Sequence, residues 1–225
     1  MKNAAWRQEF ESVLGTGWEW QAPHEPERAP TGIAEIDAAL GGGLPRGALT
    51  EIFGPASSGR ASLLASILAQ ATSRQEICAL VDAEDAFDPV SAAAAGVMLE
   101  RLLWVRCQHD AEQALKAVDL LIQGGGFGVV ALDLADTPPE IARRISLTSW
   151  FRLRRAVEHA PTVLISVSRR PNARTCASLT VECARERVEW SGVRFTSRLL
   201  RGVRVRATST QRRKACSPAF TVRVI

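Results

Sequence analysis

The stretch Leu49–Ala61, LTEIFGPASSGRA, decides the fold of this chain. An apolar run over Leu49–Phe53 predicts a strand, the glycine-spaced loop Gly54–Gly59 follows it, and the Ala- and Leu-rich run Arg60–Thr72 predicts a helix. This order is typical of a phosphate-binding loop, in which backbone N–H groups at a helix start hold phosphate oxygens. The full pattern G-x-x-x-x-G-K-[ST] ends in a lysine that reaches the phosphates and a hydroxyl that binds Mg²⁺.

Two side chains of that pattern are replaced here. Arg60 stands at the lysine position, and its planar guanidinium cannot sit in the loop as a compact point charge does. Ala61 stands at the hydroxyl position and offers Mg²⁺ no ligand, while Ser62 lies about 100° further around the helix. We therefore expect a nucleotide-binding loop with weak or absent ATP turnover. Its members are Gly54, Pro55, Ala56, Ser57, Ser58, Gly59, Arg60, Ala61 and Ser62.

Short apolar runs alternate with helical patterns after Thr31. The sequence predicts buried strands at Ile77–Val81, Val129–Leu132 and Thr162–Val167. It predicts helices between them at Ala111–Gln123 and Pro138–His159. This alternation predicts an α/β fold with a mostly parallel central sheet flanked by helices. The last runs, Leu179–Trp190, Val193–Val205 and Phe220–Ile225, alternate apolar residues with arginines and predict antiparallel strands along one edge.

The sequence predicts two parts, residues 1–30 and residues 31–225. In the first part Trp6, Phe10, Val13 and Leu14 have helical spacing, and a proline-rich linker follows. Such a tethered helix suits docking onto a partner or a neighbouring subunit, and folding back on its own domain stays equally open. The chain has no run of about 18 apolar residues, and its N-terminus carries acids where a signal peptide needs an apolar stretch. We expect a soluble cytoplasmic protein without a membrane span, and the five scattered cysteines predict reduced thiols with no metal site.

Charge is distributed very unevenly along the chain. Residues 1–140 hold 9 basic and 20 acidic side chains, whereas residues 141–225 hold 19 and 4. Such a basic block predicts a nucleic-acid surface or an acidic partner, and neutralisation of the acidic part on folding is the alternative. The candidate contacts for single-stranded DNA are Arg143, Arg144, Arg169, Arg170 and Arg174. On a continuous helix, Arg144, Arg152 and Arg155 would also form a basic stripe.

The order of several motifs resembles the core of the bacterial RecA recombinases. The similarity is carried by TGIAEIDAALGGGLPRGALTEIFGPASSGR (31–60), CALVDAEDAFDP (78–89) and VVALDLAD (129–136), and more weakly by NARTCAS (172–178) and VRATSTQRRKACSPAF (205–220). The resemblance implies a RecA-like P-loop NTPase fold, a part in DNA repair and recombination, and binding of ATP with Mg²⁺.

The resemblance also implies roles for individual residues. Glu84 falls where the family keeps the catalytic carboxylate that orients the attacking water. Asp133 falls at the Walker B position, which helps to hold Mg²⁺ through water, and Asp88 falls at a position that contacts the adenine. Arg212 and Lys214 match a basic pair that reaches the nucleotide of a neighbouring subunit in a homo-oligomer.

The chain also departs from the RecA pattern. It contains no tyrosine, although the family's adenine-stacking tyrosine would fall near Ser91, and no glutamine ends the predicted strand Thr162–Val167. The second DNA-binding loop is shortened to Arg169–Cys176, and we expect no counterpart of the family's C-terminal domain. In these departures the chain resembles the RecA-related ImuA proteins, which are damage-induced accessory factors of the SOS response.

The ImuA resemblance implies a function in mutagenic translesion synthesis. The expected partners are single-stranded DNA together with a Y-family-like polymerase subunit and an error-prone replicative polymerase, or RecA itself. Two alternatives stay open, namely an active DNA-dependent ATPase of the recombinase type and a SulA-like inhibitor of cell division.

Overall fold

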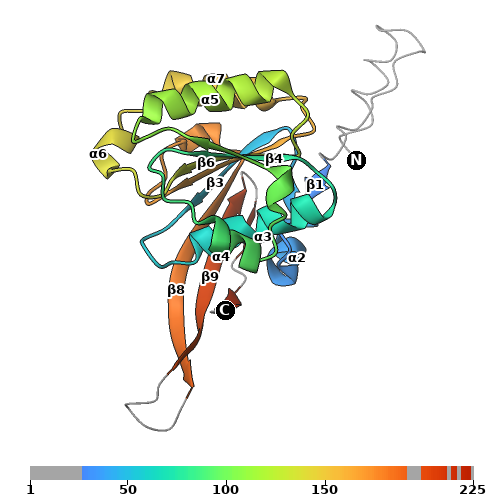
Figure 1. The fold of residues 1–225 in the computed structure, drawn as a ribbon, viewed down its shortest axis with the longest axis vertical. Helices are drawn as coiled ribbons and strands as arrows, with labels where there is room; N and C mark the ends of the chain where they lie inside the picture. Colours follow the sequence, from blue (N-terminus) through green and yellow to red (C-terminus); the bar gives the residue numbers. More distant parts are fainter. Residues whose placement is uncertain (1–26, 192–198, 212–213, 217–218, 224–225) are drawn as a thin grey trace, which may run out of the picture.

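The computed structural model describes residues 27–191, 199–211, 214–216 and 219–223, with side chains described as far as Glu186 (Figure 1). The strands are β1 (Arg28–Ala29), β2 (Leu44–Pro45), β3 (Ala48–Phe53), β4 (Cys78–Asp82), β5 (Leu102–Arg106), β6 (Val129–Leu134), β7 (Val163–Ser168), β8 (Leu179–Ser191), β9 (Leu199–Gln211), β10 (Lys214–Cys216) and β11 (Ala219–Arg223). The helices are α2 (Ala34–Leu40), α3 (Arg60–Ser73), α4 (Pro89–Ala94), α5 (Ala111–Gly124), α6 (Pro139–Ala142) and α7 (Leu147–Val157), with short 3₁₀ turns η1 (Leu99–Arg101) and η2 (Arg174–Cys176).

The central sheet is built around six parallel strands in the order β8-β3-β7-β6-β4-β5. β9 pairs antiparallel with β8, and β10 and β11 pair antiparallel with β9. The predicted α/β fold with a mostly parallel sheet and an antiparallel edge is therefore confirmed. The predicted strand Leu179–Trp190 is β8, which pairs antiparallel with β9 along its length and also pairs in parallel with β3 over Leu179–Glu182.

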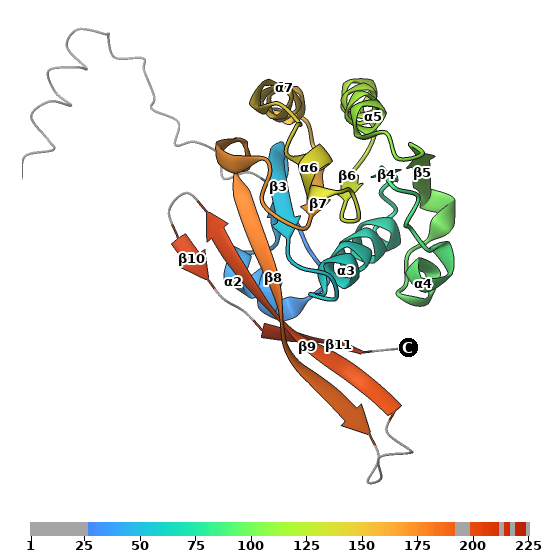
Figure 2. The same ribbon diagram turned by 90° about the vertical axis from the view of Figure 1, so that its left-hand side faces the viewer.

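Two apolar cores lie on opposite faces of this sheet, because successive side chains of a strand point to opposite sides. Helices α2, α3 and α4 cover one face and α5 and α7 cover the other (Figures 1 and 2). In β4, Leu80 faces the α3 side, whereas Ala79 and Val81 face the α5 side. Strands buried on both faces explain why these runs are almost continuously apolar.

The predicted long helix over Pro138–His159 is wrong. The chain forms the short α6, leaves the helical path at Arg143, and starts α7 after Ser146, whose hydroxyl oxygen accepts the Ser149 N–H at 3.1 Å. A serine that caps a new helix start competes with continuation of the old helix. The expected basic stripe of Arg144, Arg152 and Arg155 does not form, because Arg144 lies in the break between α6 and α7 and not on the same helix.

Some sequence predictions fall at the start of the described part. The amphipathic pattern from Trp6 to Leu14 lies outside the described residues. Arg28 and Ala29, at the end of the predicted linker, form β1 and pair with β2. No helix within the described ranges has the length and apolar content that a membrane crossing requires.

Candidate functional site

The ends of four parallel strands bring the candidate residues to one edge of the sheet. Phe53 at the end of β3 is in register with Ser168 of β7, Ser168 with Leu134 of β6, and Asp133 with Asp82 of β4. In an open α/β sheet, ligands bind outside the carboxyl ends of the strands. The glycine loop leaves β3 at this edge and leads into α3 (Figure 2).

The glycine loop is compact and has the backbone form of an anion cradle. Ser57 has φ 58° and Gly59, which precedes α3, has φ 89°. A Cβ on Gly54 would lie 2.3 Å from the Cys183 carbonyl oxygen and 2.6 Å from Ser58 Oγ, so only glycine fits there. The Ser58 hydroxyl is buried and has no hydrogen-bond partner. The first N–H groups of α3 have no carbonyl partner within the helix, as at any helix start, and so suit a phosphate oxygen.

Arg60 does not extend toward the space above this cradle. Its guanidinium is buried and donates to three backbone carbonyls, those of Gly54, Ser168 (3.3 Å) and Ala135 (3.0 Å). Burial lowers the pKa of Arg60, while Asp136, whose carboxylate lies 4.0 Å away, opposes that shift. The guanidinium stays charged. The side chain at the lysine position therefore joins the ends of three strands instead of presenting its charge to a ligand.

The side chains around the loop do not fit a catalytic Mg²⁺-ATP complex. Ala61 at the hydroxyl position is exposed and carries no oxygen, and the donors of Arg60 are taken by carbonyls. Within the described ranges no group of three or more His, Cys, Asp or Glu side chains could hold a metal ion. The backbone of the loop suits a phosphate, but Arg60 and Ala61 supply neither a lysine to clamp ATP nor a hydroxyl to bind Mg²⁺.

Asp133, the candidate Walker B carboxylate, closes the turn that follows β6. Its Oδ1 accepts the Ala135 N–H at 2.8 Å. Burial raises its pKa to about 6, with the nearby Asp82 and Asp136 acting in the same direction. The carboxylate thus lies beside the loop with a weakened preference for the charged form.

Glu84, the candidate catalytic carboxylate, lies after β4 and pairs with a histidine. Its Oε2 is 2.7 Å from Nδ1 of the exposed His109, and this hydrogen bond raises the pKa of His109. The turn that carries Glu84 is organised by the buried Asp82. The carboxylate of Asp82 accepts the N–H groups of Glu84, Ala86 and Phe87 and also that of the Trp104 ring.

Asp88, the candidate adenine contact, caps the N-terminus of α4. Its carboxylate accepts the N–H groups of Val90 and Ser91, and the Ser91 hydroxyl also donates to it. That hydroxyl lowers the pKa of Asp88. Ser91, which stands near the position of the family's adenine-stacking tyrosine, is therefore part of a helix cap.

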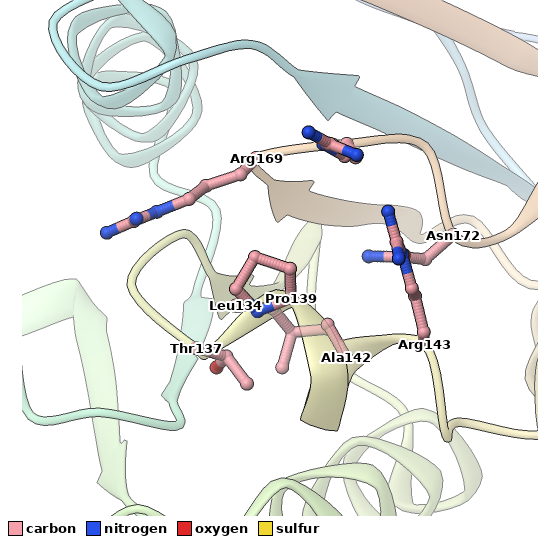
Figure 3. A pocket seen from close by; sticks show the side chains of 8 residues that line it. Leu134, Thr137, Pro139, Ala142, Arg143, Arg169 and Asn172 are labelled. Carbon is pink, nitrogen blue, oxygen red and sulfur yellow. The ribbon is translucent and has the colours of Figure 1, made fainter.

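Three of the five predicted DNA-binding arginines come together at the same sheet edge. Arg143, Arg169 and Arg170 line a shallow hollow between the β6–α6 turn and the segment after β7, with Asn172 beside them (Figure 3). Figure 3 shows Arg143 rising from the end of α6 toward Asn172. The other two, Arg144 and Arg174, are exposed, but they do not line the hollow.

Comparison with known proteins decides the family. The RecA N-terminal domain matches residues 11–142, which is more than half of the chain. The chain belongs to the RecA family. A Protein RecA from Chloroflexus aurantiacus is 36% identical over 157 residues, which cover 63% of this chain and 44% of that protein. Those of Methylococcus capsulatus and Deinococcus radiodurans are 49% identical over 105 residues and 47% over 104. These two matches cover 46% of this chain and 30% and 28% of the relatives, so the chain spans less than half of their length.

Other arginines of this RecA-family chain have partners away from the hollow. Arg152 and Arg154 on α7 pair with Asp119 at 3.6 Å and with Glu158 at 3.6 Å. Of the predicted subunit-bridging pair, Arg212 lies outside the described residues, and Lys214 is the first residue of β10, where only its backbone is described.

Sequence reasoning missed two acids that shape this RecA-family site. Glu51 lies fully buried in β3, and its Oε1 accepts the N–H groups of Asn172 (2.5 Å) and Ala173 (2.9 Å). Burial raises the pKa of Glu51 against the effect of these two donors. A glutamate within an apolar strand was the available signal, because a buried charge needs partners. Asp136, the second missed acid, binds Arg169 at 3.2 Å.

Proposed function

We propose that this RecA-family protein is an accessory factor of DNA repair that binds single-stranded DNA and turns over little or no ATP. In the manner of the ImuA proteins, it would act in the SOS response, in mutagenic translesion synthesis. Its partners there would be a Y-family-like polymerase subunit and an error-prone replicative polymerase, or RecA itself, with self-association as a further possibility to test.

The observation that carries this proposal is the direction of the Arg60 side chain. Its Nη1 and Nη2 donate to the carbonyls of Gly54, Ser168 and Ala135, so the guanidinium is turned toward these strand ends and is not extended toward a phosphate. Loss of a phosphate-clamping cation and of a metal ligand should each lower the rate about 10²-fold or more. Two such losses in one loop leave little turnover. ATP or its phosphates could still bind weakly to the loop backbone.

The arginine surface, formed by Arg143, Arg169 and Arg170 around the hollow, supports the DNA-binding part of the proposal. Arg143 and Arg170 are exposed at the hollow, and within the described residues Arg170 forms no ion pair with an acidic side chain, whereas Arg169 shares Asp136 with Arg60. Guanidinium groups bind phosphate oxygens in a bidentate way and tolerate any base sequence. An accessory factor that acts on damaged DNA needs this kind of sequence-independent contact.

An active DNA-dependent ATPase remains the second candidate because two carboxylates persist at the right edge of the sheet. Glu84 follows β4, and Asp133 is the second-last residue of the neighbouring strand β6, beside the loop. Their present hydrogen bonds, to His109 and to the Ala135 N–H, would have to rearrange for them to orient water or hold a metal.

Measurement of ATP hydrolysis with and without single-stranded DNA tests the proposal. The wild type should show little turnover, and the Arg60→Lys, Ala61→Thr double variant, which restores both missing groups, should gain activity. Arg46→Lys is the matched control, because Arg46 is another buried arginine that donates to backbone carbonyls, of Gly128 and Pro161, far from the loop. Robust DNA-stimulated turnover by the wild type would favour the recombinase and contradict the proposal.

Binding to a fluorescent oligo-dT at several salt concentrations tests the DNA-binding part. Contacts by Arg143 and Arg170 predict that affinity falls by about 0.7 log unit per contact for each log unit of salt. Retention of purified polymerase subunits on the immobilised protein then tests the translesion role. If the protein binds neither oligo-dT nor the polymerase subunits, the SulA-like inhibitor of cell division is the alternative that is left.

A further inference from the structure

The Arg60 guanidinium contacts both segments that carry the arginine surface. Its Nη1 donates to the carbonyls of Gly54 and Ser168, and its Nη2 donates to that of Ala135. Ser168 is the last residue of β7 and directly precedes Arg169, while Ala135 is the first residue after β6. One buried cation therefore connects the phosphate loop to the start of each arginine-bearing segment.

Arg169 shares the partners of Arg60. Its Nε donates to the same Ala135 carbonyl at 3.0 Å, and its Nη2 binds Asp136 Oδ1 at 3.2 Å. Asp136 also lies 4.0 Å from Arg60 Nη2, so one carboxylate stands between two guanidinium groups and offsets their repulsion. The position of Arg169 thus depends on where Arg60 holds Ala135 and Asp136.

Further hydrogen bonds extend this arrangement along the segment after β7. The Gly54 N–H donates to the Ser168 carbonyl at 3.2 Å, and the Ser168 hydroxyl donates to the Arg170 carbonyl at 2.7 Å. The geometry therefore fixes Arg169 and Arg170 through Ser168, which Arg60 itself contacts.

We infer that Arg60 is a positioning residue for the arginine surface and acts as a permanent internal cation. Its hydrogen bonds hold the ends of β3, β6 and β7 together through the chain's own atoms, so the surface is ordered, and binds single-stranded DNA, independently of ATP. A lysine could not replace it, because an ammonium on a single stem lacks the planar fork that reaches carbonyls of three separate elements. The DNA part of this inference rests on the proposed function, whereas the ordering part does not.

Hydrogen exchange of residues 133–137 and 168–173 in the full chain tests the ordering part. Arg60→Ala should speed exchange there by about tenfold or more, the factor expected for losing a hydrogen bond to a charged group. Arg60→Lys, which keeps the charge, should give a smaller increase and serves if the alanine variant does not fold. ATP with Mg²⁺ should leave the wild-type exchange unchanged.

Arg46→Ala is the control for general destabilisation. Arg46 is also buried and donates to the carbonyls of Gly128 and Pro161, but these residues lie at the opposite ends of β6 and β7. Its loss should not speed exchange selectively at residues 133–137 and 168–173. Equal exchange in these segments for Arg60→Ala and Arg46→Ala, or slower wild-type exchange with ATP and Mg²⁺, would overturn the inference.

Oligo-dT affinity tests the consequence for DNA. Wild-type affinity should be the same with and without ATP and Mg²⁺, and Arg60→Ala should weaken it about tenfold. Adding Arg169→Ala to Arg60→Ala should weaken it little further, because the two side chains act as a unit. Additive losses would overturn the positioning role. A wild type that does not bind oligo-dT would refute the proposed DNA function, and the exchange result would then decide the role of Arg60 by itself.

Discussion

Replacement of Asp133 by asparagine should stabilise the protein above neutral pH. Burial raises the pKa of Asp133 from 3.8 to about 6, so the folded state resists the charged form. A shift of about 2 units corresponds to about 3 kcal/mol of unfolding free energy. Because the side chain keeps some exposure, we expect about 1.5 to 3 kcal/mol. Asparagine keeps the oxygen that accepts the Ala135 N–H but carries no charge to desolvate.

The sign of the effect fixes its dependence on pH. The carboxyl group of Asp133 holds its proton more tightly in the folded state than in the unfolded state. Ionisation of Asp133 therefore lowers the stability of the wild-type protein as pH rises from about 4 through about 6. The gain in Asp133→Asn should therefore be full at pH 8 and absent below about pH 4. Urea unfolding at several pH values in the presence of EDTA measures it, with the exposed Asp136→Asn in the same turn as control. A constant difference between Asp133→Asn and wild type from pH 4 to 8 would refute the reasoning.

Three further substitutions give sharp expectations. Glu51→Ala leaves two buried N–H groups without acceptors, so we expect a loss of about 2 to 4 kcal/mol in urea unfolding and faster proteolysis within residues 169–176. Gly54→Ala places a methyl group 2.3 Å from the Cys183 carbonyl and should lower stability by about 1 to 3 kcal/mol, so an unchanged thermal midpoint would contradict the compact loop. Arg170→Ala should reduce the salt dependence of oligo-dT binding by about 0.7, and an unchanged slope would remove this residue from the DNA surface.

The sequence predicted the part of the fold that depends on local pattern. The strand before the glycine loop, the loop and the helix after it appear as β3, residues 54–59 and α3, and the buried strands β4, β6 and β7 lie within a residue or two of their predicted bounds. These elements have apolar runs that only a sheet covered on both faces can bury. β5 was missed, because LLWVR has its side chains only partly buried at the edge of the parallel strands.

The errors in the fold arose where neighbouring elements decide the outcome. Arginines and leucines from Ile141 to Val157 favour a helix throughout, and only the Ser146 cap with the buried Trp150 and Leu153 sets where α7 starts. Likewise, alternating residues predict Leu179–Trp190 as an antiparallel strand, which β8 is toward β9, but they do not show that its first residues also pair in parallel with β3. That parallel pairing follows from the return of the chain to the edge beside β3.

The candidate site could be located from the sequence, but its chemistry could not. The glycine spacing located the loop, and Glu84 after β4 and Asp133 near the end of β6 come from neighbouring strands at this sheet edge. That Arg60 would turn to the carbonyls of Ser168 and Ala135 was not predictable, because both partners come from strands far along the chain and offer backbone atoms. Such contacts leave no trace in residue types.

The paired strands β8 and β9 continue well past the sheet that anchors them. β8 pairs with β3 only from Leu179 to Glu182, and from Cys183 to Ser191 it pairs with β9 alone (Figures 1 and 2). At the tip, Trp190 and Ser191 oppose Leu200 and Leu199, beyond the stretch of β9 that β11 supports. So narrow a ribbon is marginally stable. The molecule thus combines a rigid central sheet with a flexible two-stranded ribbon. A force applied at the tip of the ribbon would separate β8 from β9 before it disturbed the helices.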